Sequence, residues 1–118
     1  MDTWDVSNVT SMDHTFCQTG FTSTGTINFG DLSNWDTSNV ENMNNMFRCM
    51  GGYKDAKVIL TGLENWDTSS VKDMKEMFYY VTENCNPIDC SGWNVTNVTS
   101  NKNFNYNVKN IITSPKWN

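Results

Sequence analysis

Residues 35–47 read WDTSNVENMNNMF, and the same pattern of thirteen residues occurs three more times in the chain. It reads WDVSNVTSMDHTF at 4–16, WDTSSVKDMKEMF at 66–78 and, more weakly, WNVTNVTSNKNFN at 93–105. The tryptophan that opens the pattern recurs after 31, 31 and 27 residues. Self-similarity at a period of roughly 20–50 residues is typical of repeat architectures, so the sequence predicts a repeat protein.

Each repeat divides into three parts. Apolar residues alternate before the tryptophans, which predicts short strands at 26–32, 57–63 and 87–90. The residues after each tryptophan predict a polar turn. Val71, Met74 and Phe78 then follow at helical spacing, which predicts a helix of about two turns. We therefore expect an α/β repeat solenoid, leucine-rich-repeat-like, with about four units of short strand, polar turn and short helix stacked in a single array.

The whole chain, residues 1–118, is predicted to be a single repeat domain. Its units begin near Trp4, Trp35, Trp66 and Trp93, and a partial fifth unit covers 110–118. The first unit follows Met1 without a capping segment, although the terminal unit of an array needs a polar outer face. We therefore interpret the chain as part of a longer array.

The apolar positions of the pattern are candidates for the core. They are the tryptophans Trp4, Trp35, Trp66 and Trp93, the valines Val9, Val40, Val71 and Val98, the methionines Met12, Met43 and Met74, and the phenylalanines Phe16, Phe47 and Phe78. Aromatic faces also bind sugars and cations, so the tryptophans have a second interpretation as a binding platform. Because they recur at a fixed place, a structural stack is the favoured interpretation.

An acidic residue follows three of the four tryptophans, as Asp5, Asp36 and Asp67. Stacked units would bring these carboxylates together, and calcium prefers six to eight oxygen ligands, so the three are weak calcium candidates. However, the fourth copy has Asn94, and both Asp and Asn side chains bond their own backbone in turns. The turn is therefore favoured over the metal, and we expect no cofactor.

The four cysteines are disulfide candidates. Cys17 and Cys49 occupy nearly equivalent places in adjacent units, and Cys85 and Cys90 enclose a turn-like span of four residues. Disulfides between Cys17 and Cys49 and between Cys85 and Cys90 are predicted, which would fit an oxidising exterior. The alternative for Cys90 is a buried core thiol, because it takes the place that leucine has in other units.

Composition excludes several classes. With 8 Lys and Arg against 13 Asp and Glu, the chain has a net charge of -5 and no basic stripe, so a nucleic-acid partner is not expected. No apolar run reaches the length of a transmembrane segment. No nucleophile and base, phosphate-binding glycine loop or isolated carboxylate pair is recognisable, so we predict that the protein is not an enzyme.

The pattern LSNWDTSNVxxMxxMF, present at 32–47, resembles the BspA-type leucine-rich repeat surface proteins of bacteria, which are also grouped as a domain of unknown function. The resemblance extends over three repeats and part of the fourth, where Asn94, Asn101 and Phe104 depart from the pattern. It implies a secreted or cell-surface attached, adhesin-like bacterial protein without catalytic activity. It implies no particular ligand-binding residues.

Three hypotheses follow. The first is an extracellular or cell-surface module for adhesion, which recognises a host or neighbouring-cell surface protein or glycan. The second is a structural spacer or self-assembling filament subunit, because unpaired edges invite self-association. The third is a cytoplasmic scaffold with four free thiols. The ligand-binding residues are unknown at this stage, although loops that vary between units are where repeat proteins place them.

Overall fold

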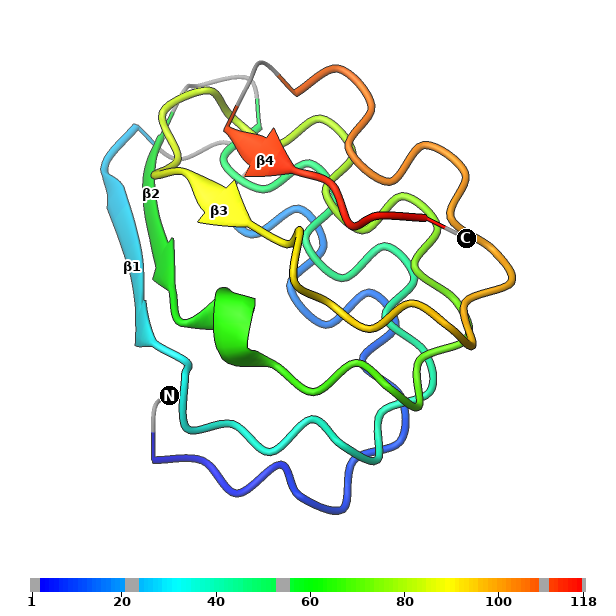
Figure 1. Ribbon diagram of the computed structural model, residues 1–118. Coiled ribbons are helices and arrows are strands. Elements are labelled where there is room, and N and C mark those ends of the chain that lie inside the picture. Colours follow the sequence, from blue (N-terminus) through cyan, green and yellow to red (C-terminus); the bar gives the residue numbers. More distant parts are fainter. Residues whose placement is uncertain (1–2, 21–23, 53–55, 109–110, 118) are drawn as a thin grey trace.

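The segments before the tryptophans form short parallel strands (Figure 1). The computed structural model describes residues 3–20, 24–52, 56–108 and 111–117. Its strands are β1 (Thr26–Asp31), β2 (Lys57–Thr61), β3 (Ile88–Asp89) and β4 (Ile112–Thr113). β1 pairs in parallel with β2, and β3 pairs in parallel with β4. Parallel pairing requires a long crossover between the strands, and here the remainder of each repeat provides it.

A side-chain amide continues the pairing from β2 to the next repeat. Val58 and Cys85 form an isolated parallel bridge. Beside it, the Leu60 N–H donates to Asn86 Oδ1, and Asn86 Nδ2 donates to the Leu60 carbonyl, both at 2.8 Å. The amide group of Asn86 therefore makes the two bonds that a backbone peptide makes elsewhere in a ladder.

The short 3-10 helix η1 (Leu63–Asn65) follows β2 after a glycine turn. Gly62 has φ +92, and a Cβ atom at this position would lie 2.3 Å from both the Ser33 backbone nitrogen and the Asp31 carboxylate. A side chain would therefore cause both backbone strain and a clash with the neighbouring repeat.

The predicted α/β repeat solenoid is wrong. The described residues contain no α-helix, and apart from η1 and the four short strands they consist of turns and extended segments. They form a small compact domain of 36 × 30 × 20 Å. The predicted helices fall at 9–16, 40–47 and 71–78, and each of these segments begins with an extended stretch that carries a β-bridge and continues as turns.

Left-handed residues define these turn segments. Positive φ occurs ten and fourteen residues after the tryptophan in all four repeats: His14 and Gln18, Asn45 and Cys49, Glu76 and Tyr80, Asn103 and Asn107. Asn45 illustrates the position, because it is the third residue of a turn that the Met46 N–H closes onto the Met43 carbonyl at 3.3 Å. A positive φ at this position is what a type II turn requires. A residue with positive φ every four positions is incompatible with an α-helix.

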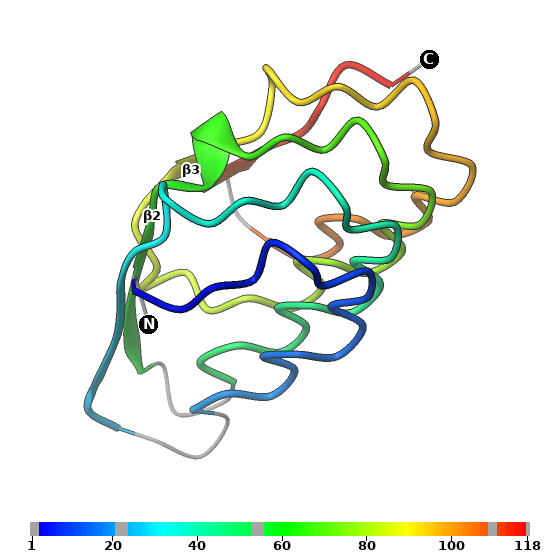
Figure 2. The same ribbon diagram turned by 90° about the horizontal axis from the view of Figure 1, so that it is seen from below.

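The remaining N–H groups of the turn segment bind the next repeat. The Asn45 N–H donates to the Lys75 carbonyl at 2.9 Å, and the Phe47 N–H donates to the Met77 carbonyl at 2.8 Å. Figure 2 shows the turn segments of successive repeats side by side, and parallel bridges join Ser11 to Asn42 and Asn42 to Asp73. Half of the donors thus close turns within a repeat, while the other half join it to its neighbour.

This pattern explains why the helix prediction failed. A helix of two turns is unstable by itself, so tertiary contacts decide which hydrogen bonds its backbone makes. Here the equivalent segment of the next repeat lies alongside and offers carbonyl groups in register. The turn conformation also buries the apolar side chains that suggested a helix. They are all fully buried: Val71, Met74, Met77 and Phe78.

The aromatic residues of the repeats stack in two columns. Ring centroids lie 6.2 Å apart for Trp4 and Trp35, 6.0 Å for Trp35 and Trp66, and 6.3 Å for Trp66 and Trp93, with planes within 14° of parallel. Phe47 lies 5.6 Å from Phe16 and 5.3 Å from Phe78 in the same way. These are offset stacks of the kind that aromatic quadrupoles favour.

The other apolar positions of the pattern lie in one core. Its buried members include Trp35, Trp66, Trp93, Val40, Val71, Met12, Met43, Met74, Phe47 and Phe78, while Val9, Phe16 and Val98 are partly buried against it. Trp4 differs from its equivalents, since 56% of its surface is exposed. In the fourth repeat, Phe104 occupies a methionine position, and its ring meets Phe78 edge-on at 75°.

We predict that Trp66→Phe lowers the free energy of unfolding by about 1–3 kcal/mol, whereas Trp4→Phe changes it little. The Trp66 indole is buried, and its Nε1–H donates to the Leu32 carbonyl at 3.0 Å, so phenylalanine loses both a hydrogen bond and packing volume. Urea denaturation of both variants measures the difference. Equal losses in the two variants would contradict the structural role of this bond.

The left-handed positions allow a second stability test. Gln18 has φ 60 and an exposed side chain, so Gln18→Gly removes backbone strain and is expected to raise the free energy of unfolding by up to about 1 kcal/mol. Thr15→Gly, at an exposed turn position without positive φ, is the matched control and should lower it by about 0.5–1 kcal/mol. Thermal or urea unfolding checks the sign, and destabilisation by both glycines would refute the turn assignment.

Candidate functional site

The residue after the tryptophan of each repeat, an aspartate in three copies and Asn94 in the fourth, caps a turn. Asp36 Oδ1 accepts hydrogen bonds from the Ser38 N–H at 3.1 Å and from the Ser38 hydroxyl at 2.5 Å. Asp5 and Asp67 bind the serine two residues later in the same way. Asn94 Oδ1 accepts the Thr96 N–H at 3.0 Å. An amide oxygen thus replaces the carboxylate at this place, as expected for a turn-forming side chain.

These hydrogen bonds set the charge state of the carboxylates. The Ser38 hydroxyl and then its N–H lower the pKa of Asp36, and the negative charges of Asp67 and Asp5 partly oppose that shift. The same serine bonds lower the pKa of Asp5 and of Asp67. Within the described ranges, no three acidic, histidine or cysteine side chains are grouped so that they could hold a metal ion. Each of the three calcium candidates is instead bonded to the serine two residues later.

These pKa shifts predict a pH dependence of stability. The lowered pKa in the folded state means that the unfolded chain binds more protons near pH 3, so the stability present above the ordinary pKa of 3.8 is lost as the pH falls below it. We expect the urea concentration at the midpoint of unfolding to decrease as the pH is lowered from about 5 to about 2.

The triple variant Asp5→Asn, Asp36→Asn and Asp67→Asn provides the comparison. Asparagine keeps the turn acceptor, as Asn94 does, but does not titrate, so this variant should show a smaller fall in the midpoint. An acid dependence identical to that of the natural chain would contradict the role of the three carboxylates.

All four cysteines are free thiols in this structure, so the predicted disulfides are not supported. Cys17 and Cys49 are partly exposed, whereas Cys85 and Cys90 are buried. Burial raises the pKa of Cys85 to about 12 and that of Cys90 well above its usual range. Only the thiolate form of cysteine is reactive, and the raised pKa keeps Cys90 protonated. Cys90 is therefore a buried core thiol, the alternative that its place in the repeat suggested.

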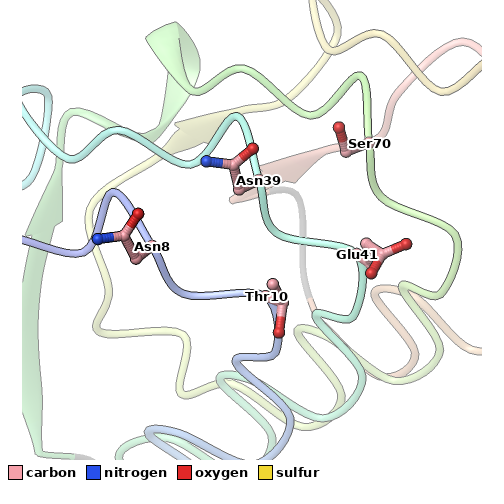
Figure 3. A pocket seen from close by; sticks show the side chains of 5 residues that line it. All are labelled: Asn8, Thr10, Asn39, Glu41 and Ser70. Atoms are coloured by element: carbon pink, nitrogen blue, oxygen red, sulfur yellow. The ribbon is translucent and has the colours of Figure 1, made fainter.

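A polar groove crosses the first three repeats. It has a volume of about 400 Å³ and is lined by Asn8, Thr10, Asn39, Glu41 and Ser70. These side chains come from two positions of the pattern, four and six residues after the tryptophan. Figure 3 shows Asn8 and Asn39 on successive repeats, Ser70 on the third, and Thr10 and Glu41 beside them.

Some of the polar atoms in the groove are engaged by the protein. Asn39 Nδ2 donates to the Ser7 carbonyl at 2.8 Å, which positions the amide and leaves its oxygen for other bonds. Glu41 accepts from Lys72 Nζ at 3.0 Å, but both side chains are at least half exposed, so this ion pair contributes little to stability.

The remaining groups have no protein partner within the described part of the chain. They are the Asn8 amide and the hydroxyl groups of Thr10 and Ser70. The equivalent groups elsewhere are occupied, since Asn97 Nδ2 donates to the Ser69 carbonyl and the Thr99 hydroxyl donates to the Lys72 carbonyl. The groove therefore offers neutral donors and acceptors that remain available to a ligand.

An exposed tyrosine cluster forms a second surface in the later repeats. Tyr79 and Tyr106 stack with ring centroids 5.3 Å apart, and Tyr80 packs against both rings. The Arg48 guanidinium lies over the Tyr79 ring, 5.0 Å from its centroid, within range of a cation–π contact. Tyr80 and Tyr106 are 44% and 51% exposed.

Sequence reasoning identified neither surface. The groove residues belong to the repeated pattern, which directed attention to its structural role. One signal was present, because the sixth residue after the tryptophan is Thr10, Glu41, Lys72 and Thr99 in the four copies. Variation at one position within a constant frame is typical of a side chain that the frame does not need.

Comparison with known proteins identifies one family. The family model described as "Mycoplasma protein of unknown function, DUF285" matches residues 1–117. No curated protein sequence and no solved structure matches the chain. Within the described ranges, none of the structural elements is an apolar helix of membrane-spanning length.

Proposed function

The chain belongs to the DUF285 family, and we propose that it is a non-catalytic recognition module on the outer surface of a bacterial cell. The resemblance of its repeats to BspA-type surface proteins supports the extracellular location and a role in adhesion. The family match is consistent with a surface repeat domain of this kind.

The groove is the observation that supports this function best. It contains an amide, two hydroxyl groups and an amide oxygen that are available for hydrogen bonding, together with the exposed Glu41 carboxylate. These groups match the hydroxyl groups of a glycan, each of which can both donate and accept. Because the groove is open and spans three repeats, it suits an extended ligand, and we propose a glycan of the host or of a neighbouring cell.

The state of the acidic residues supports a non-catalytic role. A general acid needs a pKa raised toward the operating pH, as burial in an apolar site provides. Asp5, Asp36 and Asp67 have the opposite property, because their serine bonds lower the pKa of each carboxyl group. They are therefore ionised turn caps, poorly suited to proton donation.

Binding to a glycan array tests this proposal. Asn8→Ala and Ser70→Ala should each weaken binding of the selected glycan by roughly three- to tenfold, which corresponds to one lost hydrogen bond. Tyr80→Ala is the matched control, since this residue is also exposed but lies in the tyrosine cluster. It should leave the affinity unchanged.

Three results would contradict the proposal. The folded chain could bind no glycan on the array, the two groove variants could bind like the natural chain, or Tyr80→Ala alone could abolish binding. A screen of matrix proteins run in parallel would show whether a protein ligand takes the place of the glycan.

A further inference from the structure

The fourth residue after the tryptophan is asparagine in the first, second and fourth repeats, and it is serine in the third. In two of these repeats the asparagine amide joins neighbouring repeats. Asn39 Nδ2 donates to the Ser7 carbonyl at 2.8 Å, and Asn97 Nδ2 donates to the Ser69 carbonyl at 2.7 Å. An amide N–H at this position therefore binds the carbonyl of the residue three places after the preceding tryptophan.

The third repeat lacks this bond. Its residue at the asparagine position is Ser70, and the carbonyl that an amide would reach from there belongs to Ser38. In the described part of the chain, no N–H or hydroxyl group donates to the Ser38 carbonyl, and the Ser70 hydroxyl has no protein partner. The serine oxygen lies one bond beyond Cβ, whereas the amide nitrogen of asparagine lies two bonds beyond it. Serine is therefore too short to make the same link.

The unused donor and acceptor lie at the groove. Ser70 lines it, and so does Asn39, the residue directly after Ser38 (Figure 3). Ser38 and Ser70 are both partly exposed. They belong to the second and third repeats, so the missing bond lies inside the array and results from the serine at one position. A ligand in the groove can make the bond that the protein does not make.

We propose that this place in the groove binds the acetamido group of an N-acetylated amino sugar, an inference that rests on the proposed function of the groove in glycan binding. The acetamido N–H donates to the Ser38 carbonyl, as amide groups do at the equivalent carbonyls of Ser7 and Ser69. Its carbonyl oxygen accepts from the Ser70 hydroxyl. In a trans amide the N–H and the C=O point in opposite directions, which suits an acceptor on one repeat and a donor on the next.

The charges at the groove favour a neutral amide over the ammonium group of an unacetylated amino sugar. Glu41 Oε1 lies 3.0 Å from Lys72 Nζ, so the carboxylate that lines the groove already has a cationic partner. An ammonium group would bring a second positive charge close to Lys72, and like charges repel. An acetamido group adds no charge.

Calorimetry with three β1,4-linked tetrasaccharides tests the ligand class. They consist of N-acetylglucosamine, glucose or glucosamine units, so they differ only in the group on the second carbon of each sugar. The natural chain should bind the acetylated tetramer roughly fivefold or more tightly than either of the others, which is the effect expected from one added hydrogen bond.

Ser70→Asn tests the residue that sets this preference. The variant supplies the missing amide from the protein itself, which should pair with the Ser38 carbonyl as Asn39 pairs with Ser7. The affinity for the acetylated tetramer should then fall to that for the glucose tetramer. Without any ligand, the added bond should raise the urea concentration at the midpoint of unfolding. Ser91→Asn is the matched control, since this serine is also partly exposed but lies outside the groove, and it should change neither measurement.

The outcomes separate this inference from the proposed function. Equal binding of the acetylated and glucose tetramers, or tighter binding of the glucosamine tetramer, overturns the inference and leaves glycan recognition standing. A Ser70→Asn variant that keeps the full preference for the acetylated tetramer overturns it as well. If the chain binds none of the three, the inference fails, and the glycan array decides the rest. Binding of another glycan on the array preserves the proposed function, whereas no binding removes both.

Discussion

The structure depends on how the N–H groups of the turn segments are divided between two sets of acceptors. One set closes turns inside the repeat, as from Met46 to the Met43 carbonyl, and the other crosses to the next repeat, as from Asn45 to the Lys75 carbonyl. A helix would have directed all of them along its own axis. Since the second set needs an equivalent segment in register, no repeat can complete its hydrogen bonds alone.

The side-chain columns follow from this ladder. Once the backbones are in register, equivalent residues lie above one another, so tryptophan meets tryptophan and phenylalanine meets phenylalanine. Indole groups suit the site because their Nε1–H can reach a carbonyl of the preceding repeat, as from Trp93 to Leu63 at 2.9 Å. The buried hydroxyl groups of Thr37 and Thr68 make a parallel set of links to the carbonyls of Asp67 and Asn94.

In this repeat structure, the positions that the fold requires are distinct from the surface positions that can contact a ligand. The constant residues are buried or bonded to the backbone, and the acidic residue after the tryptophan is used as a turn cap. The position of Thr10, Glu41 and Lys72 lies on the surface, where its identity changes without altering the ladder. The groove takes Thr10 and Glu41 from this position, and recognition can therefore differ between related chains while the fold is kept.

The sequence by itself determined the repeat, the short strands before the tryptophans and the turn role of Asp36, since these depend on local spacing and on bonds between near neighbours. Only the tertiary structure decided that Val71, Met74 and Phe78 belong to turns, because their spacing fits a helix equally well and the choice depends on acceptors from another repeat. The groove was not predictable for the same reason. Asn8, Glu41 and Ser70 are far apart in the chain, and the register of the ladder brings them together.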